Sequence, residues 1–458
     1  MNLERWFGIA AAGSSVRTEV LGGVTTFVTM AYIIVVNPAI LAFAGLPVGA
    51  STVATVLVAA GGSLLMGLYA KRPIGVAPYM GENAFIAFGL ATLGISWQQR
   101  LGAVFLGGLL FLLITLLGVR RWLAESISPS LKYSFAAGIG LFLALIGLYE
   151  GGVVDSAASG MPVAALLAPG TDLLRSPDVP LKLGNLREPT VLLVLFGLLV
   201  TVALLLRRVR GAVFLGIAAT AGAGYLFGLG TAPAGVFALP FRGEYDLSPI
   251  AFQLDIAGVL RLELFPVLLT LFLMGFLDTL GTLLAVGAAG NLLDEKGNLP
   301  GIERPMVVDA VACVASGLLG TSTSGAFIES ATGIREGART GLAAVVTGGL
   351  FALSLFFLPL VAPLQQMRYA YSPALVIVGL LMVTTIRRVE LDDLTEAVPA
   401  FLTITLMVFT YNIANGLTAG LVAWPAVKLL AGRWREIGPG ALVLGLACLA
   451  YYLFGLPH

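Results

Sequence analysis

The chain has 458 residues, of which 58% are hydrophobic and only 11% are charged. Soluble domains carry about 25% charged residues, so this composition indicates an integral membrane protein. A net charge of +1 without a basic patch argues against nucleic acid as a partner. The only histidine is His458, which excludes Ser-His-Asp and Cys-His catalysis. Cys313 and Cys448 lie in apolar stretches, so we expect no disulfide framework, no metal site, no cofactor and no enzyme activity.

Apolar runs long enough to cross a bilayer need about 20 residues, and on this basis fourteen spans are predicted. They lie at 20–44, 50–70, 74–92, 101–119, 132–149, 189–206, 211–229, 263–288, 305–320, 321–337, 341–361, 369–386, 396–413 and 415–431. Lys and Arg gather in alternate connections, which predicts a cell-membrane protein with a cytoplasmic N-terminus. We see no signal peptide before the first span.

Three stretches outside these spans are less regular. The outer connection 150–188 shows no periodicity, and the outer connection 230–262 ends in a predicted interfacial helix near 250–262. The apolar tail 438–456 is long enough either to span the membrane or to lie along it.

The stretch Gly320–Leu342 is small, polar and Gly-rich, although it lies between two long apolar runs. Irregular backbone at membrane depth survives only where protein or a water-filled cavity surrounds it. We therefore predict a short extended piece, Thr321–Phe327, followed by a short helix that begins near Ile328. Glu329 would then lie at a helix start, which is the usual position of a transporter binding site. The alternative is an ordinary cytoplasmic loop rich in turn residues.

A similar interruption occurs in the third span, where Ile74–Met80 runs into a second predicted helix start. A shift of 247 positions places Glu82-Asn83 over Glu329-Ser330 and Ala31 over Asp278. The two broken spans are then the third and the tenth, in equivalent places of two sets of seven. Because seven is odd, the sets have opposite orientation, which predicts an inverted repeat.

Three carboxylates remain at mid-depth: Glu82, Asp278 and Glu329. An acid at the centre of a lone helix costs about 2.5–3.5 kcal/mol, so such acids mark functional sites by default. The alternatives are a structural hydrogen bond for Asp278 and helix capping for the two glutamates. Asp309 and Glu396 lie nearer the cytoplasmic ends, where we expect them to reach water and to have no special role.

These acids favour a neutral or weakly basic solute linked to protons. A protonated carboxyl both donates and accepts hydrogen bonds, so it matches the edge of a planar heterocycle. Phe85 and Phe327 are candidates to cover the face of such a ring, although packing against lipid or core is the alternative for each. We also expect Glu82 to face Glu329 across the repeat axis and to serve in proton coupling.

The chain resembles the adenine–guanine–hypoxanthine permeases (AzgA-like) of the nucleobase–ascorbate transporter group. The resemblance covers nearly the whole chain and is carried by four motifs: TEVLGGVTTFVTMAYIIVVNP, APYMGENAFIAF, GFLDTLGTL and FIESATGIREGARTGL. It implies an all-α polytopic fold of two inverted sevens, a homodimer and proton symport of purine bases. A core domain would comprise 1–119 and 263–361, and a dimerising gate domain 120–262 and 362–458.

The same resemblance assigns residues to the site. It implies that Asn83, Asp278 and Glu329 bind the base. The repeat register adds Ser330, the hydrogen-bonding side chain that follows Glu329, as a further candidate. Proton coupling would fall to Glu82, Asp278 or Glu329. Glu82 departs from the pattern, because several members have a neutral residue before the docking asparagine.

Three rival functions remain open. One is a uracil or xanthine transporter of the same fold. Another is an anion exchanger or channel on the same scaffold, which the mid-depth acids disfavour. The third is an intramembrane hydrolase with Ser324 as nucleophile, which lacks a histidine base.

Overall fold

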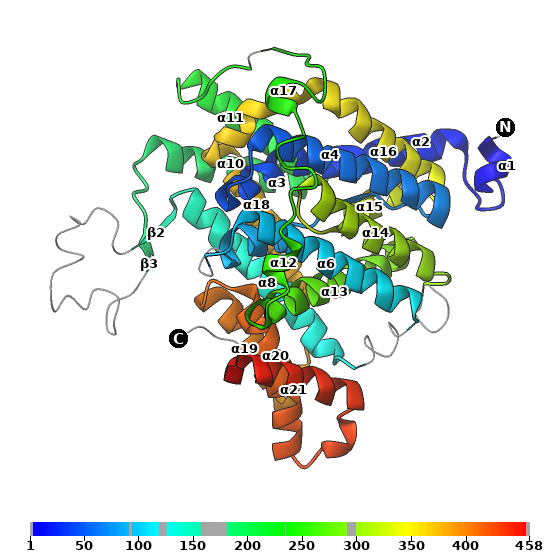
Figure 1. The fold of residues 1–458 in the computed structure, drawn as a ribbon. Coiled ribbons are helices and arrows are strands. Elements are labelled where there is room, and N and C mark those ends of the chain that lie inside the picture. Colours follow the sequence, from blue (N-terminus) through cyan, green and yellow to red (C-terminus); the bar gives the residue numbers. More distant parts are fainter. Residues whose placement is uncertain are drawn as a thin grey trace.

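The computed structural model describes residues 3–90, 94–118, 126–156, 181–233, 235–290 and 299–454. Helices dominate these residues (Figure 1). The first half contains α1 (Leu3–Phe7), α2 (Val16–Met30), α3 (Ile33–Leu41), α4 (Val48–Leu65), α5 (Met80–Ala84), α6 (Trp97–Leu116), α8 (Pro129–Glu150), α10 (Pro189–Leu206) and α11 (Ala212–Leu226). The second half contains α12 (Ile256–Val259), α13 (Phe265–Ala289), α14 (Glu303–Leu319), α15 (Ser330–Arg335), α16 (Gly341–Ser354), α17 (Leu358–Gln366), α18 (Arg368–Val383), α19 (Leu394–Phe409), α20 (Ile413–Leu430) and α21 (Pro439–Phe454). Four short strands accompany them: β1 (Val76–Pro78), β2 (Val154–Ser156), β3 (Leu181–Leu183) and β4 (Ser324–Ala326).

Within the described ranges, nine helices are long and apolar enough to cross a membrane. The shorter apolar helices Ala212–Leu226, Leu394–Phe409 and Pro439–Leu449 add to them. The chain is therefore a multi-pass membrane protein, as its composition predicts. The count of fourteen segments and their inverted arrangement stay predictions.

The first predicted span, 20–44, is not one continuous helix. It begins earlier, at Val16, and is interrupted at Ala31–Tyr32, between α2 and α3. Pro38 within α3 has no N–H, so the carbonyl of Ile34 loses its helical donor. Gln365 of α17 supplies that donor instead, with 2.8 Å between Nε2 and the carbonyl oxygen. A neighbouring segment thus satisfies backbone that a proline has freed inside the membrane.

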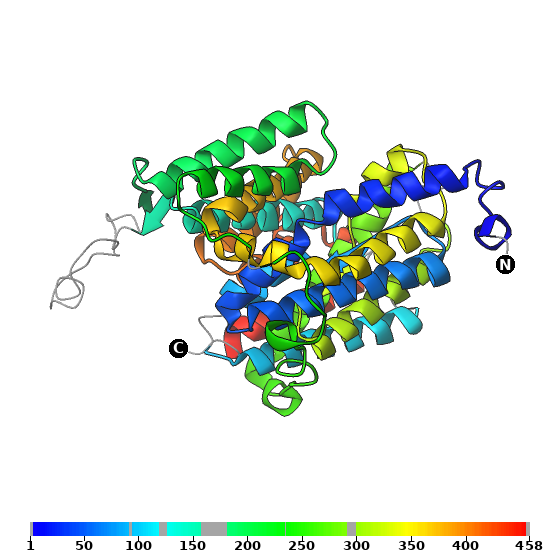
Figure 2. The same cartoon turned by 90° about the horizontal axis from the view of Figure 1, so that it is seen from above.

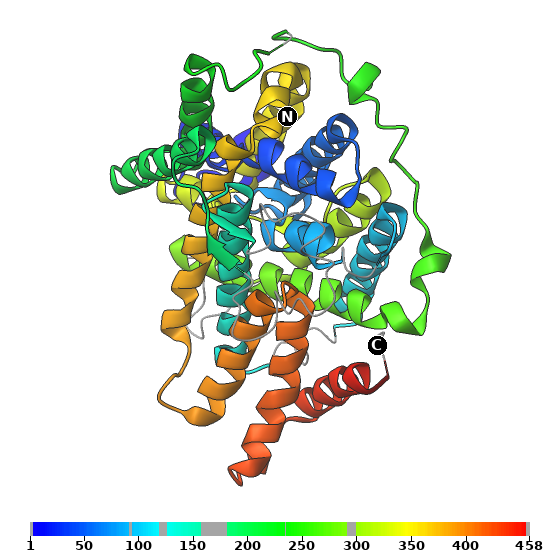
Figure 3. The ribbon, with the colours of Figure 1, turned by 90° about the vertical axis from the view of Figure 1, so that its left-hand side faces the viewer.

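The regions outside the predicted spans are also clearer in the structure. Helix α12 covers only Ile256–Val259, so the interfacial helix expected over 250–262 is much shorter. The tail forms α21, which packs beside α20 and crosses its lower end in Figure 3. Tyr452 of α21 donates from its hydroxyl to the carbonyl of Asn415 at 2.9 Å. Strands β2 and β3 pair antiparallel within the outer connection, whose residues 157–180 lie outside the described part.

The helices pack in two groups. Helices α2, α4, α14 and α16 pack with α3, α6 and α15, whereas α8, α10, α11 and α18 pack with each other and α19 packs on α8 and α20. Figure 2 shows α10 and α11 on the opposite side of the molecule from α4 and α14. Glycines allow the closest approaches, as membrane helices require: a Cβ on Gly341 would lie 2.0 Å from the carbonyl oxygen of Gly67, and one on Gly379 would lie 2.4 Å from that of Gly140. The domain boundaries expected from the sequence stay predictions.

Aromatic rings join the two groups at one end. Phe88, which follows α5, contacts Phe43 with 5.1 Å between ring centroids, and Tyr411 with 6.2 Å. Tyr411 also contacts Phe142 of α8 at 5.2 Å. Elsewhere an ion pair of 2.6 Å joins Arg210, between α10 and α11, to Glu336, which follows α15.

The two broken segments meet in a small antiparallel ladder inside the first group. Val76 faces Ala326, Ala77 faces Gly325 and Pro78 faces Ser324. Every residue of both strands is buried. This arrangement confirms the two extended pieces expected at Ile74–Met80 and Thr321–Phe327.

The outer edges of this ladder are satisfied by side chains rather than by further strands. On the β1 edge, the Ser63 hydroxyl accepts from the N–H of Val76 at 2.9 Å and donates to its carbonyl at 3.2 Å. On the β4 edge, Asp309 Oδ2 accepts from the N–H of Ala326 at 2.9 Å. The Cys313 thiol donates to the Ser324 carbonyl at 3.0 Å. Side chains of the protein therefore pair the backbone polar groups at both edges of this buried ladder.

Candidate functional site

Each strand of the ladder leads directly into a short helix that starts with an acid. Helix α5 begins at Met80 with Glu82 in its first turn, and α15 begins at Ser330 with Glu329 immediately before it. The start of α15 lies two residues beyond the expected position at Ile328. The predicted helix starts are thus present, and both open from the same ladder.

Glu82 and Asn83 are wholly buried, with none of either side chain exposed. Both carboxyl oxygens of Glu82 and Oδ1 of Asn83 lack a hydrogen-bond partner among the described residues. Buried polar atoms are nearly always hydrogen-bonded in folded proteins. These three buried oxygens therefore keep hydrogen-bonding capacity for a proton, a ligand or water.

Asp278 lies in the middle of the unbroken helix α13 and is half-buried. Helix α13 contacts α5, and the Asp278 carboxyl is a charged neighbour of the buried Glu82 carboxyl. Alignment of the two halves does not show this neighbour, because the shift of 247 positions pairs Asp278 with Ala31 rather than with Glu82. The expectation that Glu82 faces Glu329 stays a prediction.

Glu329 is half-buried and is held by Tyr32, at the interruption between α2 and α3. The buried phenol donates to Glu329 Oε1 at 2.7 Å. A second contact between the same elements joins Thr29 to Thr332 at 3.1 Å. The neighbouring Ile328 is 56% exposed, so this part of the site is open. Sequence reasoning missed Tyr32, although a polar residue beside a helix break in the middle of an apolar span is a usable signal.

Asn37 of α3 holds the other helix start and was also missed. Its Oδ1 accepts from Asn83 Nδ2 at 2.9 Å and from the Ser322 hydroxyl at 3.0 Å. Its Nδ2 donates to the hydroxyls of Thr55 and Thr321 at 2.8 and 2.9 Å. Asn37 thus makes all four of its hydrogen bonds inside the protein.

The remaining expected site residues lie close to the helix starts, and their roles stay predictions. Phe85 is fully buried where α5 ends. Phe327 is nearly buried and lies parallel to Tyr79, with 6.3 Å between ring centroids. The Ser330 hydroxyl accepts from the backbone N–H of Gly75 at 2.9 Å, which ties α15 to the strand before α5.

Asp309 and Glu396 do not reach water as expected. Asp309 is wholly buried, because it satisfies the backbone edge of β4. Glu396 is only 8% exposed and pairs with Lys428 at 3.0 Å, near the start of α19. The sequence shows how near each acid lies to the end of its predicted span. It does not show which other segments pack over that end and shield the acid from water.

Ser324 also has a structural environment. Its hydroxyl lies 2.8 Å from that of Ser316 and donates to the Ser322 carbonyl at 3.1 Å, within the buried ladder. A nucleophilic serine needs an adjacent base, and these neighbours are a hydroxyl and a carbonyl. Within the described residues, no cluster of three His, Cys, Asp or Glu side chains is placed to hold a metal.

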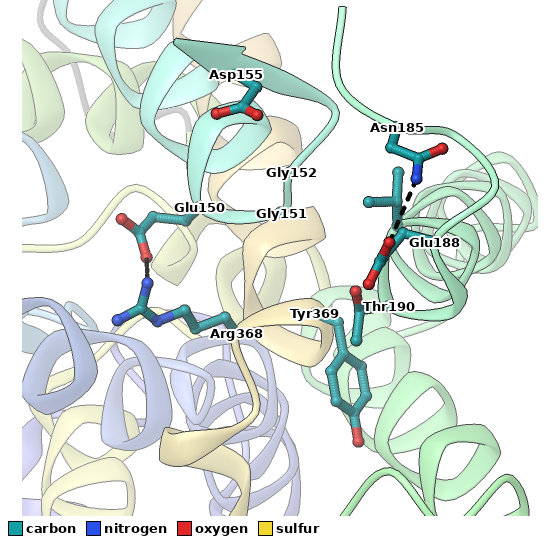
Figure 4. A pocket seen from close by; sticks show the side chains of 10 residues that line it. Glu150, Gly151, Gly152, Asp155, Asn185, Glu188, Thr190, Arg368 and Tyr369 are labelled. Carbon is teal, nitrogen blue, oxygen red and sulfur yellow. Dashed lines mark hydrogen bonds and ion pairs between the residues drawn. The ribbon is translucent and has the colours of Figure 1, made fainter. Parts of the chain in front are cut away.

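A separate cavity of about 350 Å³ lies at the far end of α8 (Figure 4). Glu150, Asp155 and Glu188 contribute carboxylates to its wall. Arg368 pairs with Glu150 at 3.4 Å and also lies over the ring of Phe43 at 4.9 Å. This cavity lies away from the two helix starts and shares no residue with them.

Comparison with known proteins identifies the family of this chain. A model of the Permease family (Xan_ur_permease) matches residues 17–418. The chain belongs to this family. The permease is 38% identical to the adenine permease AdeQ of Escherichia coli over 95% of its own length and 92% of that protein. It is 37% identical to the guanine/hypoxanthine permease PbuG of Bacillus subtilis over 99% of its length and all of PbuG.

These relatives confirm the resemblance to adenine–guanine–hypoxanthine permeases that the four motifs carry. Members of this family are permeases, that is, transporters rather than enzymes. Among solved structures, the transmembrane domain of the cyanobacterial bicarbonate transporter BicA matches with a TM-score of 0.61. That match covers 89% of the permease and 97% of the BicA domain at 16% identity, and it shows a shared fold only.

Proposed function

We propose that the permease imports purine nucleobases by proton symport with alternating access. The observation that carries the proposal is the acidic junction of the two broken segments, in a chain whose relatives are named for adenine, guanine and hypoxanthine. Glu82 and Glu329 lie at the two helix starts, and Asp278 lies on α13, which contacts both α5 and α15. Among the described residues, none of the three forms an ion pair with Lys or Arg. Such a site suits a neutral base with N–H groups and a proton.

In this proposal some acids bind the base and others carry the proton. Asp278 and Glu329 bind the base, with Asn83 and Ser330 beside them and Phe85 and Phe327 near its ring face. The proton resides on Glu82, Asp278 or Glu329. The packing of α13 against α5, with Asp278 as a charged neighbour of Glu82, favours that pair, because two neighbouring carboxylates in a low-dielectric site hold one proton more readily than two negative charges.

The inverted repeat is part of the same proposal. The shift of 247 positions exchanges the pair Ala77–Gly325 with the pair Pro78–Ser324, so it maps the ladder onto itself. Ser63 and Asp309, which satisfy the two edges, come from the second and ninth predicted segments, which are equivalent in the two sevens. We further propose a cytoplasmic N-terminus, a core domain that carries the site and a homodimer formed through the gate domain.

Two rival functions remain to be separated by experiment. A uracil or xanthine transporter would use the same fold and the same acids. An anion exchanger would share the fold of the bicarbonate transporter, but its substrate would meet carboxylates where it needs cations or free N–H groups.

Ligand binding to the folded state raises thermal stability by mass action. The purified permease should therefore be stabilised by adenine, guanine or hypoxanthine and not by uracil, xanthine or bicarbonate. In proteoliposomes, an inward proton gradient should drive accumulation of the stabilising base, and a protonophore should abolish it. Stabilisation by uracil or xanthine alone would move the function to the first rival, and chloride- or bicarbonate-dependent currents would move it to the second.

Orientation is tested separately with single cysteines. Cysteines at Lys71, Arg208 and Arg387 should be shielded from impermeant thiol reagents in intact cells, and one in the 150–188 connection should react. Labelling at Arg208 from outside would contradict both the cytoplasmic N-terminus and the odd number of segments per repeat.

A further inference from the structure

Thr55 fixes the orientation of the Asn37 side-chain amide, because the hydroxyl proton of Thr55 is already donated to another residue. Thr55 donates from its hydroxyl to the carbonyl of Ser51 at 2.7 Å, one helical turn earlier in α4. Towards Asn37, only 2.8 Å away, Thr55 can therefore only accept. The nitrogen of the Asn37 amide must face Thr55, and its oxygen must face the opposite way.

This orientation determines that of Asn83. The Asn37 oxygen accepts from Asn83 Nδ2 at 2.9 Å, so the Asn83 nitrogen is directed into the protein. The same nitrogen also contacts Met80 Sδ at 3.7 Å. The Asn83 oxygen remains buried and has no partner among the described residues. Asn83 therefore offers the site a hydrogen-bond acceptor, while its N–H groups are engaged within the protein. Beside it, both oxygens of Glu82 are open as well.

The start of α15, the second wall of the proposed site, has the same character for a different reason. Tyr32 donates to Oε1 of Glu329, and among the described residues no other side chain donates to this carboxylate. Thr29 and Thr332 pack α2 against α15 beside this bond, so the phenol and the carboxylate are held together. The open atom of Glu329 is again an acceptor.

We propose that the permease selects its base by the base's own N–H donors, and above all by an exocyclic amine. The inference rests on the proposed function and specifies the substrate within it. The open side-chain oxygens on both walls belong to Glu82, Asn83 and Glu329, with Asp278 beside Glu82. The Asn83 oxygen and the ionised Glu329 carboxylate accept hydrogen bonds, and so does each carboxyl oxygen of Glu82 and Asp278 that carries no proton. A base that brings an amine pairs with these acceptors, whereas a base with only a hydrogen at that position leaves them unpaired. Asn37 and Tyr32 act as positioning residues, because they fix which atoms stay open.

Two pairs of bases isolate the amine. Guanine and hypoxanthine differ only in the 2-amino group, and adenine and purine differ only in the 6-amino group. A site with hydrogen-bonding groups rejects an analogue that lacks the matching partner, because its buried polar atoms stay unpaired. Binding of the four bases to the purified full-length permease, measured by titration calorimetry, should show the amine strengthening affinity at least about tenfold in one pair or both.

Glu329→Gln tests the wall formed by α15. Gln keeps the shape of Glu, and Tyr32 still donates to its Oε1, so the new Nε2 points to the open side as a donor. We expect the affinity for guanine to fall and the ratio of guanine to hypoxanthine affinity to shrink below about threefold. Adding Tyr32→Phe frees the amide to rotate, which should restore part of the lost ratio. A purely structural role for Tyr32 would lower the affinity for both bases together and leave the ratio unchanged.

Asn83→Ala tests the wall formed by α5 and keeps the inference testable if Glu329→Gln fails to fold. It removes one open acceptor, so it should lower affinity for the amine-bearing base of a pair more than for its partner. The inference is overturned if the amine changes wild-type affinity less than about twofold, or if both variants leave the ratios unchanged. In either of those cases bases still bind, and the proposed function stands. If none of the four bases binds the wild type, the proposed function fails and the inference fails with it.

Discussion

The two broken segments are built alike, but they hold their acids differently. Each consists of a short buried strand that leads into a helix start with a glutamate. Glu82, at the start of α5, is wholly buried, has no side-chain hydrogen-bond partner in the described part of the chain, and has Asp278 as a charged neighbour. Glu329, at the start of α15, is half-buried, accepts from Tyr32 and lies beside the exposed Ile328.

This difference separates two kinds of chemistry on one scaffold. A carboxylate that already receives a hydrogen bond is stable as an anion and can accept from a ligand. A carboxylate buried against another carboxylate is stable only if a proton lies between them. Under the proposed function, the α15 side is therefore suited to recognise the base, and the α5–α13 side is suited to carry the proton.

Removing the acids that bind the base should have the largest effect. Asp278→Ala and Glu329→Ala should each reduce purine affinity at least ~10-fold, because a hydrogen bond to a charged group is worth ~1.5–3 kcal/mol. The measurement is calorimetric titration of each purified variant, with membrane insertion and monodispersity as controls. Normal binding in both variants would show that the site lies elsewhere.

Removing the groups that close the ladder edges should lower stability instead of affinity. Asp309→Ala leaves the N–H of Ala326 buried and unpaired, and Ser63→Ala does the same for Val76. Each should cost ~1–3 kcal/mol, seen as a lower melting temperature in a thermal unfolding assay. Asp309→Asn, which keeps an acceptor, is the matched control. Equal melting temperatures for wild type and Asp309→Ala would contradict the edge role of this acid.

Asn83→Ala should have an intermediate effect. Its oxygen is a neutral acceptor, and neutral hydrogen bonds contribute ~0.5–1.5 kcal/mol, so purine affinity should fall only ~2- to 10-fold. The same titration measures it, and Asn83→Asp serves as a control that keeps the open oxygen. If Asn83→Ala lost as much purine affinity as Glu329→Ala, the α5 side would be the main element that recognises the base, contrary to the roles proposed above.

Glu82→Gln should change affinity least and pH dependence most. Gln keeps the shape of Glu but cannot exchange a proton. Purine affinity should stay within a few fold, while the pH dependence of binding and of concentrative uptake should flatten. Uptake in proteoliposomes over a range of external pH is the measurement. If accumulation remains as pH-dependent as in the wild type, the proton resides on Asp278 or Glu329.

The parts of the fold that follow from local sequence were predictable. Runs of apolar residues place the membrane helices, and the polar, Gly-rich stretches place both broken segments, since neither pattern depends on distant contacts. The start of α15 was correct to within two residues.

The parts that depend on contacts between distant segments were not. Alignment of the halves compares equivalent positions, so it could not show that α13, which carries Asp278, contacts α5. Tyr32 and Asn37 were missed for a related reason. A polar side chain in an apolar span, such as Tyr32 or Asn37, indicates that it has a hydrogen-bonding partner. The sequence does not show that the partner is Glu329 or Asn83, or which of its atoms forms the bond.

The closed edges of the β1–β4 ladder have a mechanical consequence. Backbone hydrogen bonds join the two strands directly, and Ser63 and Asp309 fasten them to α4 and α14. Gly75 adds a further tie to Ser330 at the start of α15. The starts of α5 and α15 cannot separate or slide past one another without breaking several of these bonds. Any motion that exposes a bound solute to the other side of the membrane must therefore carry both walls together as one rigid unit.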